Sequence, residues 1–183
     1  MVSGDDADAA LLFRETALVH LDDVYTLARY LLGNAADAED ATQECFLRAF
    51  KHFESCRSDA VKPWLFAILR NVCRAEWTRR GSAPTPSDAA DDGAAAPLWM
   101  PDTATPEAAM LRRLDDETMR RLIAALPDEF RETIVLREVS ELSYREIAEV
   151  TGAPVGTVMS RLARGRALLR TAWLAAEQEG LSA

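Results

Sequence analysis

Apolar residues recur at steps of three and four along most of this chain, the spacing of an amphipathic helix. One stripe runs from Leu18 to Leu32 and is followed by Gly33 and Asn34, residues that typically end a helix. A second stripe covers residues 41–53. A third helix is expected to begin at Pro63, because proline suits a first helical turn. The positions expected to face the core are Leu18, Leu21, Val24, Tyr25, Ala28, Leu31, Leu32, Ala41, Cys45, Phe46, Ala49, Phe50, Phe53, Leu65, Ile68, Leu69, Val72 and Cys73.

Helical spacing returns in the C-terminal third of the chain. One helix is expected to end near Leu126, just before Pro127, and a second to span residues 128–139 with Phe130, Ile134 and Val135 inward. A short helix at 143–150 and a longer one from 154 to about 175 follow. No segment alternates between apolar and polar residues as a strand would. The pattern therefore predicts an all-α fold.

Residues 81–110 separate the two helical regions. The stretch is rich in Ala, Asp, Pro, Ser and Thr and has no helical or strand period, which is typical of a flexible linker. Within it Leu98, Trp99 and Met100 form an apolar island, either packed on a neighbouring domain or serving as a docking segment. We therefore expect two small helical domains, residues 1–80 and 111–177, joined by the linker 81–110.

Residues 142–170 have the layout of a helix-turn-helix. Ser143 and Glu146 have the spacing of a capping box, and Gly152 can adopt the left-handed conformation of a tight turn. With Val155, Val158 and Leu162 facing the core, the second helix would present an outer face suited to a DNA major groove. That face consists of Thr157, Ser160, Arg161 and Arg164. A helical hairpin with a merely solvated arginine face would show the same pattern.

The distribution of charge along the chain bears on whether the protein could bind DNA. The net charge of −9 is unfavourable for a protein that binds DNA unaided. Residues 55–80, however, carry six basic residues against two acidic ones, and residues 155–170 carry four arginines and no acid. Two local basic patches therefore lie in an acidic chain.

The patch at 63–80 combines cations with an aromatic side chain: Arg70, Asn71, Arg74, Trp77, Arg79 and Arg80. Such a surface suits single-stranded DNA, whose bases stack on rings while arginine contacts phosphate. Alternatively, Trp64 and Trp77 belong to the core and the arginines only solvate the helix.

Other chemistry finds little support in the sequence. Cys45, Cys56 and Cys73 fit neither a disulfide framework nor a zinc knuckle, and with only His20 and His52 as imidazole ligands we expect no metal or cofactor. Reduced thiols favour a cytoplasmic protein. No nucleophile–base pair or phosphate-binding loop indicates an enzyme. No apolar run approaches the roughly 18 residues of a membrane helix.

Four motifs, in order, resemble extracytoplasmic-function sigma factors, a family of RNA polymerase subunits. They are DAEDATQECFLRAF (37–50), PWLFAILRNVCRAEWTRR (63–80), LPDEFR (126–131) and residues 142–170. The resemblance implies that Asp37, Asp40, Gln43, Glu44, Leu47 and Arg48 bind the polymerase core enzyme. Carboxylates and an amide suit charged docking on a basic partner.

The resemblance further implies two DNA contacts. Single-stranded −10 DNA would be melted and held by Arg57, Lys62, Arg70, Asn71, Arg74, Trp77, Arg79 and Arg80, with loop 54–62 receiving a flipped base. Duplex −35 DNA would be read by Arg137, Thr157, Ser160, Arg161 and Arg164, whereas Met159 departs from the basic residue that relatives often carry.

An anti-sigma protein is a further expected partner, and acidic residues of the linker could imitate nucleic acid. The rival interpretation is a free-standing helix-turn-helix regulator with an N-terminal sensory domain. The basic, tryptophan-bearing stretch 63–80 argues against that rival, because a sensory domain has no need of such a surface.

Overall fold

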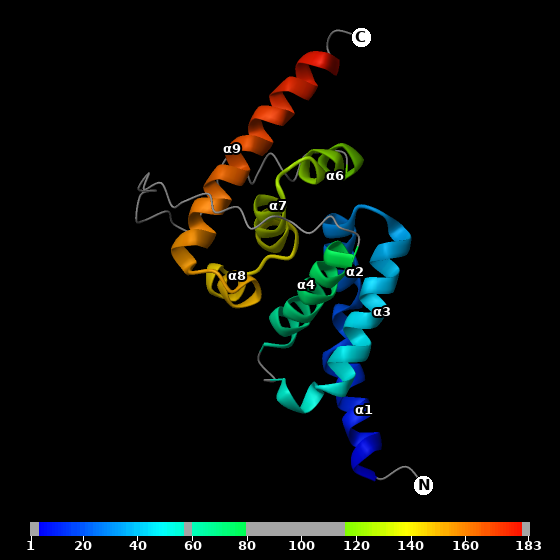
Figure 1. Ribbon diagram of the computed structural model, residues 1–183. Coiled ribbons are helices and arrows are strands. Elements are labelled where there is room, and N and C mark those ends of the chain that lie inside the picture. Colours follow the sequence, from blue (N-terminus) through cyan, green and yellow to red (C-terminus); the bar gives the residue numbers. More distant parts are fainter. Residues whose placement is uncertain (1–3, 57–59, 80–115, 181–183) are drawn as a thin grey trace. The chain divides into compact units, whose positions relative to one another are not determined.

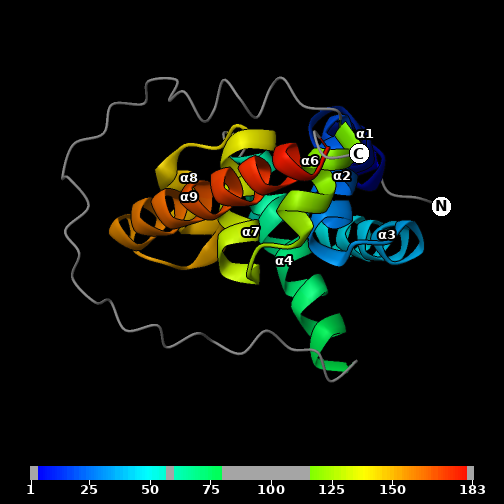
Figure 2. The ribbon, with the colours of Figure 1, turned by 90° about the horizontal axis from the view of Figure 1, so that it is seen from above.

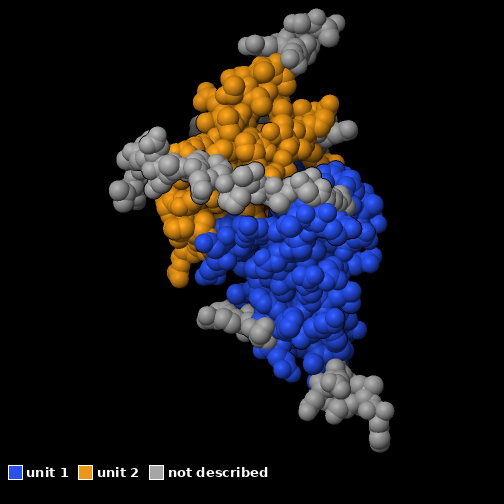
Figure 3. Space-filling view, viewed as in Figure 1, with its two compact units in different colours: residues 1–83, 149–152 blue, residues 84–148, 153–183 orange. Residues whose placement is uncertain are grey.

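The computed structural model describes residues 4–56, 60–79 and 116–180, and every regular element within those ranges is helical (Figure 1). The expected all-α class is therefore confirmed. The chain divides into two compact units, residues 1–83 with 149–152 and residues 84–148 with 153–183 (Figure 3). The proposed linker 81–110, including Leu98, Trp99 and Met100, lies outside the described residues.

The N-terminal unit contains α1 (Gly4–Thr16), η1 (Leu18–His20), α2 (Leu21–Leu32), α3 (Ala35–Lys51), η2 (Phe53–Ser55) and α4 (Val61–Arg79). Helices α2, α3 and α4 pack against one another, as Figure 1 and Figure 2 show from two directions. Their core is formed by fully buried side chains from α2 and α4, among them Val24, Leu27, Leu65, Phe66 and Leu69.

The predicted helix end at Gly33 and the predicted start near Pro63 are confirmed, whereas α3 (Ala35–Lys51) begins well before Ala41, the first residue of the second stripe. Gly33 ends α2 with φ +83°, and Asn34 caps α3 by accepting a hydrogen bond from the Asp37 amide at 2.8 Å. Helix α4 begins at Val61, two residues before Pro63, because the Ala60 carbonyl already accepts the Trp64 amide at 3.0 Å. Proline in this first turn leaves no hydrogen bond unmade.

The apolar pattern predicted burial for several residues of this unit that are in fact exposed or half-buried. Leu18 and Leu21 are exposed, because residues 18–20 form a 3-10 turn that breaks the helical period before α2. Phe50 is also exposed, although its ring meets that of Phe13 edge to face with centroids 5.2 Å apart, and Ile68 is half-buried. Helix α1 was not predicted at all, and among its described side chains Phe13 is the buried one, in contact with the rings of Phe46, Phe50 and Phe53.

The C-terminal unit contains α6 (Asp116–Ala124), α7 (Asp128–Ile134), the π-helical turn η3 (Val135–Val139), most of α8 (Tyr144–Thr151) and α9 (Val155–Gly180). Arg131 of α7 closes the end of α6 by donating to the carbonyls of Ala124 and Leu126 at 2.8 and 2.9 Å. Phe130, expected inward, is half-buried, and Val155, expected in the core, is exposed because it is the first residue of α9.

Helices α7 and α9 approach each other closely at one glycine. A Cβ atom placed on Gly165 would lie 2.9 Å from Cγ1 and 3.3 Å from Cδ1 of Ile134, a fully buried side chain. Because Ile134 is β-branched and enclosed, it cannot move aside without strain. Glycine is therefore required here for close packing, not for backbone flexibility.

We predict that Gly165→Ala lowers the free energy of unfolding of the C-terminal unit by about 1–2 kcal/mol, because overpacking outweighs the gain in helix propensity. Gly156→Ala is the matched control on the same helix, since nothing lies within 4 Å of a Cβ there. Urea unfolding of the two variants measures the difference. Equal stability of both variants would contradict the packing argument.

Candidate functional site

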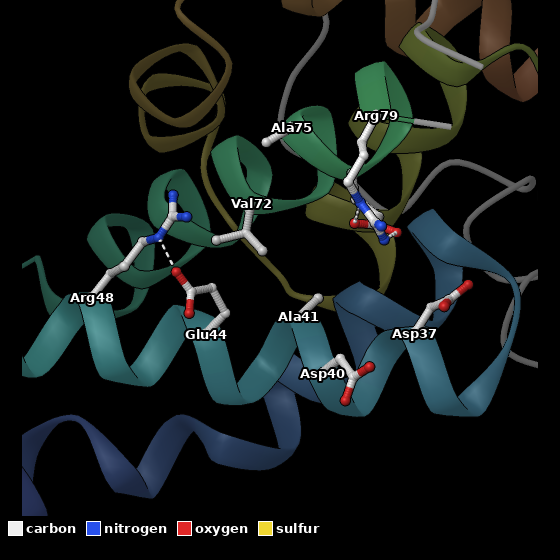
Figure 4. A pocket seen from close by; sticks show the side chains of 9 residues that line it. Asp37, Asp40, Ala41, Glu44, Arg48, Val72, Ala75 and Arg79 are labelled. Atoms are coloured by element: carbon white, nitrogen blue, oxygen red, sulfur yellow. Dashed lines mark hydrogen bonds and ion pairs between the residues drawn. The ribbon is translucent and has the colours of Figure 1, made fainter. Parts of the chain in front are cut away.

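A groove of about 270 Å³ runs between α3 and α4 (Figure 4). Its walls carry carboxylates, its floor is made of small apolar side chains, and two arginines stand at its rim. The lining residues are Asp37, Asp40, Ala41, Glu44, Arg48, Val72, Ala75, Glu76 and Arg79. Four of the six residues predicted to bind the polymerase core enzyme thus come together in one concave surface.

The remaining two predicted core-binding residues, Gln43 and Leu47, also lie exposed on α3, and the Leu47 side chain is 58% exposed. Cys45 and Phe46 on the opposite side of α3 are buried, so the expected division of this helix into a polar and a core face is confirmed. Within the groove, Glu44 accepts a hydrogen bond from Nε of Arg48 at 2.6 Å. Asp37 interacts with the Asn34 side chain, which leaves Asp40 as an exposed carboxylate at the rim.

Cys45 lies directly behind the groove and contributes no reactive thiol. Burial raises the pKa of Cys45 to about 12, and the positive charge of Arg48 offsets this only in part. The sulfur instead faces the Leu65 carbonyl at 3.4 Å. The thiol is therefore a small core residue, in agreement with the sequence-based interpretation.

The cations of α4 do not share one face. Residues 70, 74 and 77 are separated by about one and two helical turns and so lie on the same side, whereas residue 79 is two and a half turns from residue 70 and lies opposite. Arg79 accordingly lines the groove and donates to both carboxylate oxygens of Glu76, with Nε at 3.0 Å and Nη2 at 2.5 Å. The structure therefore separates Arg79 from the predicted −10 contacts Arg70, Arg74 and Trp77.

The other predicted −10 residues are more scattered. Arg74 and Asn71 are exposed on α4, and Trp77 is half-buried. Lys62 forms an ion pair with Asp23 of α2 at 3.1 Å and lies over the Phe66 ring, 5.7 Å from its centroid. Arg57 and Arg80 lie outside the described residues.

The C-terminal unit contains the predicted helix-turn-helix, formed by α8 and α9. Its capping box is present: the Ser143 amide donates to Glu146 at 2.7 Å, and the Glu146 amide donates to the Ser143 hydroxyl at 3.3 Å. Gly152 has φ +69°, as the turn requires. Val158 and Leu162 are buried, so α9 directs Ser160 and Arg164 away from the core, and it leaves Thr157 and Arg161 half-buried at its flank.

The predicted −35 residues differ in what restrains them. Arg164 is exposed, and within the part of the chain that the structure describes it makes no hydrogen bond or ion pair. Arg161 is paired with Glu129 of α7 at 3.5 Å. Ser160 donates to the Thr157 carbonyl at 3.0 Å. Arg137 donates to the Leu142 carbonyl at 2.8 Å and lies over the Tyr144 ring, so it braces the segment that leads into α8.

Sequence reasoning missed the ion pair that anchors α9. Arg166 donates through Nε and Nη2 to one oxygen of Glu138 at 3.0 and 2.6 Å, and both side chains are only 14% exposed. Burial alone would lower the pKa of Arg166, but the hydrogen bond and charge of Glu138 outweigh it and raise the pKa. The two residues are 28 positions apart, so no local motif could have indicated their contact.

Glu138→Gln leaves the Arg166 guanidinium without its carboxylate in a poorly solvated place, and we predict a loss of about 2 kcal/mol in the stability of the C-terminal unit. The double variant Glu138→Gln/Arg166→Met should recover most of that loss, because it removes the unpaired charge. Chemical denaturation compares the two. A double variant no more stable than Glu138→Gln would contradict the anchoring role.

Other kinds of site find no support in the described ranges. No three His, Cys, Asp or Glu side chains there are grouped so that they could hold a metal ion. Among the helices of those ranges, none combines the length and apolar composition that a membrane span requires.

Comparison with known protein families matches both units. The family model for sigma-70 region 2 covers residues 18–83, which include the groove and α4, and the model for sigma-70 region 4 covers residues 116–169, which include the helix-turn-helix. The fold and the surfaces described above thus coincide with two regions of a bacterial transcription initiation factor.

Two individual relatives show which family of initiation factors the chain resembles. The chain is 33% identical to the ECF RNA polymerase sigma factor SigW of Bacillus subtilis over 92% of this chain and 91% of that protein. It is 36% identical to the RNA polymerase sigma-H factor of Pseudomonas aeruginosa, over 73% of this chain and 71% of that protein. The chain therefore belongs to the ECF family of RNA polymerase sigma factors, and it directs RNA polymerase to promoters.

Solved structures agree with this fold. The sigma factor RpoE of Bartonella quintana, crystallised with the anti-sigma factor NepR, has a TM-score of 0.67 at 27% identity and covers 87% of this chain and 94% of its own. CnrH, solved in complex with the cytosolic domain of CnrY, has a TM-score of 0.64 at 24% identity, covering 93% of this chain and 95% of its own.

Proposed function

We propose that the α3–α4 groove is the docking site for core RNA polymerase. The supporting observation is its composition: the exposed carboxylate of Asp40 stands at the rim, beside a floor formed by Ala41, Val72 and Ala75. A carboxylate rim favours a cationic partner, and a small apolar floor leaves room for the aliphatic stem of a lysine or arginine. Arg79 belongs to this docking surface in our proposal, because it lines the groove.

The opposite side of α4 is proposed to hold melted −10 DNA. Arg74 is exposed there, and Arg70 and Trp77 lie on the same side of the helix, whereas the exposed Asn71 lies about a quarter of a turn away. Arginine and a tryptophan ring along one helix can track phosphates and stack on unpaired bases. Lys62 would have to leave Asp23 in order to join them, so we assign it a secondary role.

In the C-terminal unit, α9 is proposed to enter the major groove of the −35 element with Thr157, Ser160, Arg161 and Arg164. Arg137 supports the helix-turn-helix from behind through Leu142 and Tyr144. We assign residues 1–80 and 111–177 to the two DNA-binding domains and residues 81–110 to the linker between them. The protein contributes binding energy and no chemical step, and it acts in the cytoplasm, where its polymerase works.

A free-standing helix-turn-helix regulator is the less well supported function. Such a protein binds its operator alone, for which an excess of nine negative charges is unfavourable. It also has no use for a cation-and-tryptophan face on α4 or for an acidic groove behind it.

We also propose that an anti-sigma protein holds this chain inactive, as the NepR complex illustrates for a relative. Leu47 and Phe50 are 58% and 52% exposed on α3, and a helix laid over them would cover the adjacent core-binding face. Val135 in the C-terminal unit is fully buried, so it cannot line a second docking groove for such a helix.

The expected result of purifying the chain from its native cell before induction is a small stoichiometric partner that core polymerase displaces. This regulation requires that the anti-sigma protein and core polymerase cannot bind the chain at the same time. Recovery of the factor only as a free monomer or with polymerase would contradict this regulation.

Reversing two charges tests the docking site. Asp40→Lys/Glu44→Lys should abolish core binding and run-off transcription while leaving thermal unfolding unchanged, because both side chains lie on the groove rim and outside the core. Asp22→Lys is the matched control, since Asp22 is an exposed carboxylate on α2 that does not line the groove. A folded double variant that binds core as well as the control would rule out the groove.

A further inference from the structure

The two arginines of the α9 face are held in different ways. Arg164 is exposed and unpaired among the described residues, whereas Nη2 of Arg161 lies 3.5 Å from Oε2 of Glu129. The Arg161 and Glu129 side chains are only 27% and 22% exposed. Glu129 belongs to α7, so the contact depends on the packing of two helices and not on the local sequence of α9.

That packing is rigid enough to fix the position of the carboxylate. Gly165 lets α9 approach Ile134 of α7, and the Glu138–Arg166 pair ties η3 to α9. Glu129 is the second residue of α7, where a negative charge is favoured by the helix dipole. The carboxylate therefore stands at a defined place beside the α9 face.

The contact engages only part of the guanidinium group. Arginine carries five N–H donors in a planar fork, and an ion pair through Nη2 leaves other donors for a base edge. A guanidinium group already held in one orientation loses less conformational freedom when it forms a bidentate contact. A carboxylate beside the DNA-facing surface also repels phosphate, which disfavours contacts that do not depend on sequence.

We propose that Glu129 is a specificity-determining residue of the −35 interface, which positions Arg161 for paired hydrogen bonds to one guanine. The inference rests on the proposed role of the α9 face and extends it to a residue on another helix. Glu129 itself touches no base and acts through Arg161. Arg164, which has no such partner, then contributes affinity more than selectivity.

The test uses holoenzyme assembled with each variant and promoter fragments in which every −35 base pair is changed in turn. Arg161→Ala should reduce discrimination at one base pair by about ten-fold. Glu129→Gln should reduce discrimination several-fold at that same base pair while affinity for mismatched fragments holds or rises. The double variant should discriminate no worse than Arg161→Ala alone, because both changes act on one contact.

One further variant distinguishes the position of the Glu129 carboxylate from its negative charge, and a second serves as a control. Glu129→Asp keeps the charge but shortens the side chain by one methylene, so a positioning role predicts relaxed discrimination here too. A role as a repulsive charge predicts wild-type behaviour. Glu149→Gln on α8, an exposed residue, is the control for loss of one carboxylate in the helix-turn-helix.

Three results would overturn the inference. Unchanged or sharper discrimination in Glu129→Gln, with Arg161→Ala relaxed, would reject the role of Glu129 and leave the α9 face intact. An equal loss on all fragments, accompanied by a lower unfolding temperature, would show a purely structural role. No effect of Arg161→Ala at any base pair would reject this inference together with the role of Arg161 in the proposed −35 interface.

Discussion

Electrostatic repulsion is the constraint on which the rest of this structure depends. A chain with a net charge of −9 has to contact a polyanion, and we propose that it does so with cations confined to particular helix faces. On α4, Arg70 and Arg74 lie on one side, whereas the acidic groove occupies another. In our proposal the groove repels DNA and attracts a basic protein, so the same charge distribution accounts for a factor that uses promoters only together with polymerase.

The second requirement is stiffness in the helix-turn-helix. Discrimination between base pairs depends on arginines that are held within a fraction of an ångström, which an isolated helix cannot provide. Here three contacts fix α9: the close approach of Gly165 to Ile134, the Glu138–Arg166 pair, and the Glu129–Arg161 pair. The exposed side of the helix then retains one unpaired arginine, Arg164, within the described ranges. In the proposed −35 interface, the packing of α9 and its recognition of DNA thus depend on the same contacts.

Local chemistry was the part that the sequence could predict. Gly33, Gly152 and the Ser143–Glu146 capping box depend on neighbours within a few residues, and all are found as expected. Features that depend on tertiary packing escaped prediction, such as the Glu138–Arg166 pair and the exposure of Leu18. Arg79 was grouped with the −10 cations because it is near them in sequence. Its helical phase, which was available from the spacing, puts it in the groove instead.

The central claim is that the chain binds promoters only as a polymerase subunit, and a single binding experiment tests it most directly. Labelled promoter DNA is titrated with the purified chain, with and without core polymerase, at near-physiological salt. The account predicts a sequence-specific complex only when core is present, because the free chain is too acidic to hold duplex DNA. Specific binding of similar affinity by the chain alone would contradict it.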